Sequence, residues 1–203
     1  MNEGYLKILN SIASDSPTPG GGSVAALTLA HAHALAAMVA NLTLKTEKWS
    51  EGHEIAKQIL DNSQVCIDES IKLAKNDAQA FDAVIAAYRI PKDDSSNRTK
   101  SIREATIGAA IVPLETVQAS LDLLDKILPF SSVCNANALT DLAAAGELSF
   151  SAAKIAQLNV RINIQYISGN DVDSIEKTTD NAIVKCEQSI LELRSTCSKR
   201  LNW

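Results

Sequence analysis

Residues 24–42 read VAALTLAHAHALAAMVANL, nineteen residues without an Asp, Glu, Lys or Arg. Eight of them are alanine, the residue with the highest helix propensity. The run is long enough to span a membrane, but alanine favours membrane insertion only weakly, and Thr28, His31, His33 and Asn41 interrupt it. It therefore predicts a helix buried at the centre of a soluble bundle.

The composition of the whole chain points to the same fold class. Of 203 residues, 46% are hydrophobic but only 4% are aromatic, and 29 are alanine. β-Sandwiches and barrels contain more β-branched and aromatic residues, and disordered chains contain fewer apolar ones. We therefore expect a single all-α domain over residues 1–203, a multi-helix bundle in which long helices flank a buried Ala-rich central helix.

Charge and cysteine content argue against several classes of protein. A net charge of −5 and an isoelectric point near 5.2 disfavour binding to nucleic acid. The four cysteines are widely spaced, without a CxxC pair or a histidine at zinc-ligand spacing, and residues 1–14 lack the pattern of a signal peptide. We expect a cytoplasmic chain with reduced thiols that binds neither nucleic acid nor a membrane.

Apolar spacing, prolines and glycines predict where the helices begin and end. Ser23 is the expected N-cap of the central helix, Pro113 is expected to kink a later helix, and Pro129 to end it. Gly146 is expected to end a short helix. The predicted helices span residues 2–13, 23–43, 51–88 (with or without a break), 102–127, 138–145, 149–167 and 172–200.

Residues 17–23 read PTPGGGS and lead directly into the central helix. They form no Walker A loop, since Gly-Lys-Ser/Thr is absent, and no dinucleotide fingerprint, since no strand precedes them. Three glycines allow a ligand to approach the backbone, and the helix behind them presents unpaired N–H groups that attract a carboxylate or phosphate. A tight turn before a buried helix explains the same residues equally well.

Asp77 stands on an otherwise apolar helix face, which it shares with Ala74, Phe81 and Val84. Burial there would raise the pKa of its carboxyl group and suit it to proton transfer near neutral pH. The alternative is an aspartate at the edge of this face that reaches water.

Asp141, Asn159 and Asn163 are further polar residues in apolar surroundings. Asp141 is either a site residue or a helix N-cap. The two asparagines lie one helical turn apart, where their amides could recognise a ligand or satisfy backbone groups at a helix crossing. His31 and His33, two residues apart, point in opposite directions and cannot share a metal ion, so at least one is expected in the core and no metal site is expected.

Several segments together resemble the cyclodeaminase/cyclohydrolase family, which includes the C-terminal half of formiminotransferase-cyclodeaminase and the stand-alone methenyltetrahydrofolate cyclohydrolases. They cover nearly the whole chain in order. Two departures are Thr140, where serine is usual, and the histidines of the central helix, where small residues are usual. The matching segments are residues 17–26 (PTPGGGSVAA), 37–43 (AMVANLT), 77–81 (DAQAF), 89–92 (RIPK), Asn135 with Thr140-Asp141, and 159–164 (NVRINI).

The resemblance implies an all-helical folate enzyme that acts at the N5–N10 bridge of tetrahydrofolate. It would convert 5-formimidoyltetrahydrofolate to 5,10-methenyltetrahydrofolate and ammonia. The alternative is a cyclohydrolase that converts 5,10-methenyltetrahydrofolate to 10-formyltetrahydrofolate, and a second alternative is a helical protein that binds folate without catalysis. No cofactor beyond the folate substrate and no metal ion is implied, and the resemblance suggests a homodimer or larger homo-oligomer.

The resemblance also implies roles for the residues singled out above. Asp77 would transfer the proton. The backbone of Gly20, Gly21, Gly22 and Ser23 would face the folate. Asp141, Asn159 and Asn163 would bind the pterin ring, and Lys45, Lys48 or Lys92 would bind the glutamate tail.

Overall fold

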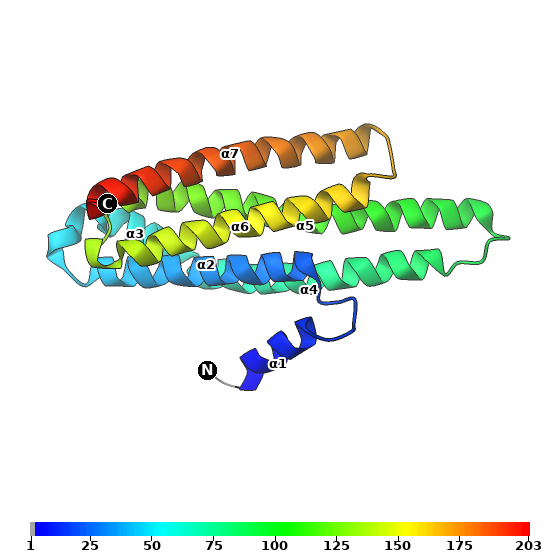
Figure 1. Cartoon of the computed structure of the whole chain (residues 1–203), viewed down its shortest axis with the longest axis horizontal. Coiled ribbons are helices and arrows are strands. Elements are labelled where there is room, and N and C mark those ends of the chain that lie inside the picture. The colour runs from blue at the N-terminus through cyan, green and yellow to red at the C-terminus, as the bar shows by residue number, and fades with distance from the viewer. Residues whose placement is uncertain (1–2) are drawn as a thin grey trace.

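The computed structural model describes residues 3–203, so Met1 and Asn2 of the first predicted helix lie outside the described residues. Within this range all regular secondary structure is helical, without a strand (Figure 1). The α-helices are α1 (Glu3–Ile12), α2 (Gly21–Leu44), α3 (His53–Asp61), α4 (Ser63–Tyr88), α5 (Ser95–Val133), α6 (Leu139–Ile164) and α7 (Asn170–Leu201), with short 3-10 helices at Glu47–Gly52 and Ala136–Ala138.

Four long helices, α2, α4, α5 and α6, pack side by side as a bundle, and α7 covers α5 and α6. Figure 1 shows α1 projecting away from the bundle, beyond α2 and α4. The predicted all-α bundle with a buried Ala-rich helix is confirmed: α2 contacts α4 and α6, and its alanines 25, 26, 32, 36 and 40 are fully or almost fully buried. Such small side chains allow neighbouring helices to pack closely.

The helix ends predicted at Gly146 and Pro129 are wrong because tertiary packing overrides the local signal. Residues 139–164 form the single helix α6, and Gly146 lies in its interior, where an added Cβ would overlap Leu193 of α7. Gly146 thus serves the α6–α7 contact and does not end a helix. Pro129 also lies inside a helix, since α5 continues to Val133.

Pro113 affects the contact between α5 and the neighbouring helix α6. Proline has no backbone N–H, so the carbonyl oxygen of Ala109, four residues earlier on α5, receives no helical hydrogen bond from it. Asn163 of α6 fills this place, since its Nδ2 donates to the Ala109 oxygen at 2.8 Å. A proline on one helix therefore requires a side-chain amide on the next.

Two helices, α2 and α5, are long and apolar enough to cross a membrane by length and composition. In α2, 56% of the qualifying window is buried inside the bundle, and a core helix of a soluble protein passes the same test. The absence of membrane binding therefore stays a prediction.

We expect Asn163→Ala to lower the free energy of unfolding by about 1–3 kcal/mol, because the Ala109 carbonyl group loses the side-chain N–H group that takes the place of the missing Pro113 N–H. Pro113→Ala restores a backbone N–H to α5, so the same Asn163→Ala change should cost clearly less in that background. Urea denaturation of the wild type, both single variants and the double variant measures this coupling. Equal costs in the two backgrounds would contradict the pairing of Pro113 with Asn163.

Candidate active site

A pocket of about 260 Å³ opens where the first turn of α2 meets α4, α5 and α6. Most of the glycine turn and three of the polar residues predicted from the sequence lie in it. Its lining consists of Pro17, Thr18, Gly20, Gly21, Gly22, Asp77, Phe81, Ala109, Asn159, Ile162 and Asn163. Glycine turn, aspartate and asparagines are thus brought together from segments that lie far apart in the sequence.

The carboxyl group of Asp77, on α4, lies directly against the backbone of Gly22. A Cβ added at Gly22 would overlap Asp77 Oδ1 and lie only 2.6 Å from Cγ, so a residue larger than glycine would displace the carboxyl group from this position. The neighbouring Ser23, which is 1% exposed, donates from Oγ toward Asp77 Oδ2 at 3.0 Å. Gly22 therefore brings the carboxyl group close to α2, and Ser23 holds it there.

The N-terminus of α2 supplies the electrostatic environment of this carboxyl group. The helix begins after Gly20, which makes no side-chain cap, and its first turn contains no acidic residue. The predicted N-cap, Ser23, is instead the third residue of the helix. Because the first N–H groups of a helix lack intrahelical partners, Asp77 meets the positive end of the α2 dipole from a neighbouring helix.

Burial raises the pKa of the Asp77 carboxyl group above its ordinary value of 3.8, because desolvation disfavours the carboxylate. Hydrogen bonds from the Ser23 hydroxyl and backbone N–H oppose this shift without cancelling it. Of the two alternatives that the sequence left open, the half-buried Asp77 matches the carboxyl group of raised pKa, and this shift brings it closer to the pH at which an acid-base residue works.

Asn159 and Asn163, on α6, present mainly hydrogen-bond acceptors to the pocket. Asn159 Nδ2 donates to the Ile155 carbonyl oxygen at 2.9 Å, and Asn163 Nδ2 donates to the carbonyl oxygens of Ala109 and Asn159, both at 2.8 Å. Asn163 thus uses both N–H groups of its amide, whereas Asn159 keeps one N–H group that can donate, and both Oδ1 atoms remain to accept from a ligand. Asn163 therefore satisfies backbone groups at a helix crossing, and its recognition of a ligand stays a prediction.

Of the predicted site residues, Ser23 contacts Asp77 without lining the pocket, and Asp141, Lys45 and Lys92 lie farther away. Asp141 is on α6, eighteen residues before Asn159, or roughly 27 Å away along the helix axis. Lys45 follows the far end of α2, roughly 36 Å from Gly21. Lys92 lies in the turn between α4 and α5, at the tip of the bundle (Figure 1). Periodicity shows which face a residue occupies but not which helix ends meet.

Phe81 is a pocket residue whose role the sequence did not show. It was expected in the core but is 38% exposed and lines the pocket one helical turn from Asp77. Its spacing of four residues from Asp77 was the available signal.

Of the two histidines on α2, His33 is buried. Desolvation, and second to it the charge of Lys126, lower the pKa of His33 to about 4, as expected of a core histidine.

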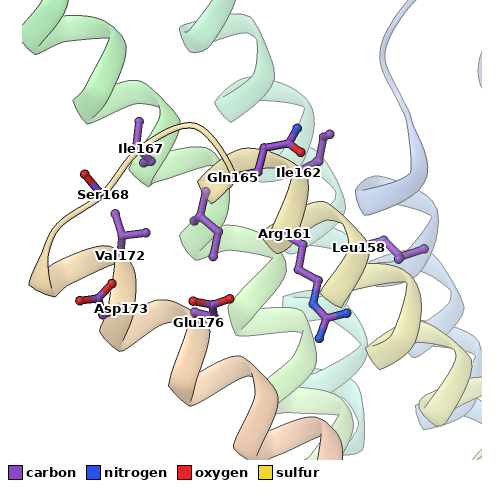
Figure 2. A pocket seen from close by; sticks show the side chains of 10 residues that line it. Leu158, Arg161, Ile162, Gln165, Ile167, Ser168, Val172, Asp173 and Glu176 are labelled. Atoms are coloured by element: carbon purple, nitrogen blue, oxygen red, sulfur yellow. The ribbon is translucent and has the colours of Figure 1, made fainter.

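A larger hollow of about 520 Å³ lies at the turn between α6 and α7 (Figure 2). Its charged lining residues are Arg161, Asp173 and Glu176, and Arg161 also pairs with Asp180 at 3.0 Å. The net charge of this lining is negative, so the hollow is poorly suited to an anionic ligand.

Among residues 3–203, no group of three or more His, Cys, Asp or Glu side chains could hold a metal ion.

Comparison with known proteins places this geometry in a family. The chain is 33% identical to the methenyltetrahydrofolate cyclohydrolase of Methylorubrum extorquens over 165 residues, which are 80% of this chain and 79% of that protein. It is 27% identical to the formimidoyltransferase-cyclodeaminase of Rattus norvegicus over 160 residues, which are 77% of this chain but only 30% of that longer protein.

The fold is also similar to a solved structure. The crystal structure of formiminotetrahydrofolate cyclodeaminase from Thermotoga maritima superposes with a TM-score of 0.82 at 26% identity and covers 97% of this chain and 94% of its own. The family model described as formiminotransferase-cyclodeaminase matches residues 5–182. The chain therefore belongs to the formiminotransferase-cyclodeaminase family, in agreement with the resemblance found in its sequence.

Proposed function

We propose that the chain is a folate one-carbon enzyme that converts 5-formimidoyltetrahydrofolate to 5,10-methenyltetrahydrofolate and ammonia. The observation that carries this proposal is a single carboxyl group of raised pKa, Asp77, held between a helix N-terminus and two amides in a small pocket. The names of the Thermotoga maritima structure and of the Rattus norvegicus relative support the same reaction class.

One carboxyl group of this kind suffices for the proton transfers. N10 of the folate attacks the carbon of the protonated formimidoyl group (C=NH₂⁺) and loses its proton to the Asp77 carboxylate, which leaves an NH₂ group on that carbon. The C–N bond to the leaving amine then breaks, and the protonated Asp77 returns the proton to that amine, which departs as ammonia. A carboxyl group that acts first as base and then as acid requires a pKa near the working pH.

The pocket fits the pterin end of the substrate. A volume of about 260 Å³ is below the usual range for whole drug-sized ligands, so the ring would enter and the p-aminobenzoyl-glutamate tail would remain outside. The Oδ1 atoms of Asn159 and Asn163 would accept from the pterin amino and ring N–H groups. The backbone N–H groups of Gly21 and Gly22 would donate to the oxo group of the pterin.

The proposed reaction needs no cofactor beyond the folate substrate and no metal ion. We also propose that the protein is located in the cytoplasm.

Cyclohydrolysis of 5,10-methenyltetrahydrofolate is the second candidate activity, favoured by the match to the Methylorubrum extorquens cyclohydrolase over most of both chains. Water would attack the same bridging carbon, and Asp77 would again be the proton acceptor. We expect higher turnover on the formimidoyl substrate than on the methenyl substrate. Methenyl absorbance and ammonia release measure both, and the reverse ranking would favour the cyclohydrolase. Absence of turnover on both substrates, with folate still bound, would identify a non-catalytic folate-binding protein.

Asp77→Asn tests the catalytic assignment. We expect turnover to fall at least about a hundredfold, because general acid-base catalysis is lost. The same variant should be more stable to unfolding than the wild type, although it is less active. Because the pKa of Asp77 is raised on folding, its favourable contribution is complete below the unfolded-state value and is lost as the pH rises through the folded-state value.

Asp77→Asn should therefore unfold at a higher temperature than the wild type at pH 8, with the gain disappearing near pH 4. Asp82→Asn, an exposed change on the same helix, is the matched control and should alter neither property. An Asp77→Asn protein that is folded and turns over at the wild-type rate would remove Asp77 from the mechanism.

We also propose that the chain forms a homodimer or larger homo-oligomer. Helix α1 buries none of its residues within the chain, and Leu6, Ile8 and Leu9 are 58%, 42% and 46% exposed. An isolated ten-residue helix is not stable in water, so a second copy that covers this apolar face would stabilise it. Asp141 and Lys45 could then reach the folate from the other copy.

Light scattering should give at least twice the 21.7 kDa mass of one chain. Leu9→Asp should lower the mass to that of a monomer, because it places a charge in the apolar face of α1. Ser11→Asp on the opposite side of α1 is the control and should leave the mass unchanged. A monomeric wild-type chain would contradict the proposal.

A further inference from the structure

The hydroxyl group of Ser23 lies between two acceptors and has one proton to donate. Its Oγ is 2.9 Å from the Ala74 carbonyl oxygen and 3.0 Å from Asp77 Oδ2. A serine hydroxyl donates one hydrogen bond and accepts up to two, so it can donate fully to only one of these oxygens at a time. Ser23 is 1% exposed, which leaves little access for competing water.

The protonation state of Asp77 decides which acceptor receives the proton. A carboxylate has only acceptors, so the Ser23 hydroxyl turns toward Oδ2 when Asp77 is ionised. When Asp77 is neutral, its own O–H donates to Ser23 Oγ, and the Ser23 proton turns to Ala74. The Ala74 carbonyl group lies inside α4 and keeps its helical bond from the Ala78 N–H in both states.

We propose that Ser23 is a positioning residue for the proposed reaction, whose hydroxyl turns between Asp77 and Ala74 as Asp77 loses and regains its proton, and so holds the carboxyl group against Gly22 throughout the cycle. The inference rests on the proposed function, since it gives Asp77 the proton-transfer role. No proton leaves Ser23: its O–H bond rotates, and the transferred proton moves only between the substrate and Asp77.

The surroundings of Asp77 leave Ser23 as its principal polar partner. The helix α2 contributes Gly22 and Ser23, α5 contributes Ala109, and α6 contributes the uncharged amides of Asn159 and Asn163. On α4 itself, the neighbours three and four residues away are Leu73, Ala74, Ala80 and Phe81. Asp77 is the one titratable side chain among the residues that line the pocket.

This environment makes the effect of Ser23 measurable without an activity assay. Burial raises the pKa of Asp77, and the Ser23 hydrogen bond lowers it because it stabilises the carboxylate. Removal of the hydroxyl should therefore raise the Asp77 pKa further. The titration of the carboxyl carbon can be followed by NMR in the full chain labelled with ¹³C-aspartate, with the signal assigned by its loss in Asp77→Asn.

We expect Ser23→Ala to move the titration midpoint of Asp77 to higher pH. Ser70→Ala is the matched control, since Ser70 is also buried, lies on the same helix as Asp77 and donates to the Cys66 carbonyl oxygen of that helix. It should leave the midpoint where it is in the wild type. An unchanged or lowered midpoint in Ser23→Ala would overturn the proposal, whether or not Asp77 proves to be catalytic.

The pH profile of turnover provides the second readout. If ionised Asp77 begins the reaction, Ser23→Ala should lower kcat/KM about tenfold on the acid side of the profile, with the deficit shrinking as the pH rises. KM should change less than kcat, because Ser23 does not line the pocket. An equal loss at every pH would mean that Ser23 only supports the structure, and would overturn the proposal.

Discussion

The Asp77 carboxyl group lies on the backbone of Gly22, where α4 meets the first turn of α2, and the site depends on this contact. A Cβ at position 22 would displace the carboxyl group, so the close approach requires glycine. The approach also partly buries the carboxyl group and brings it to the N-terminus of α2, and these two effects shift its pKa in opposite directions. The position, the burial and the pKa of the Asp77 carboxyl group thus all depend on the presence of glycine at position 22.

The wall of the pocket that α5 and α6 form depends on the absence of a backbone N–H group at Pro113. The unpaired Ala109 carbonyl group draws the Asn163 amide nitrogen toward α5, and Asn163 in turn bonds the Asn159 backbone. The asparagine Oδ1 atoms are fixed as a result, without a dedicated binding loop. The small side chains of α2 complete the arrangement, because they allow α4 and α6 to pack closely on either side of the glycine turn.

The residue patterns were sufficient to predict the fold class and the approximate position of most helices, and the family resemblance predicted the grouping of Gly20–Gly22, Asp77, Asn159 and Asn163, which line one pocket. The residue patterns failed where a local signal competes with tertiary packing. Gly146 looked like a helix end, but packing against Leu193 keeps it inside α6. Ser23 looked like an N-cap, yet its hydroxyl bonds Ala74 and Asp77 of another helix. Helical periodicity contains no information about such partners.

The positions of Lys45 and Asp141 become consistent with a folate site once symmetry is considered. The pocket lining has no Lys or Arg, although the glutamate tail of a folate is anionic. Lys45 and Asp141 lie at the end of the bundle opposite to Gly21, and a two-fold axis perpendicular to α2 exchanges the two ends of that helix. If this axis passes beside the middle of α2, the end of one copy that bears Lys45 would lie beside the pocket of the other. One interface could then cover the apolar face of α1 and also bring a cation toward the tail, which neither chain provides alone.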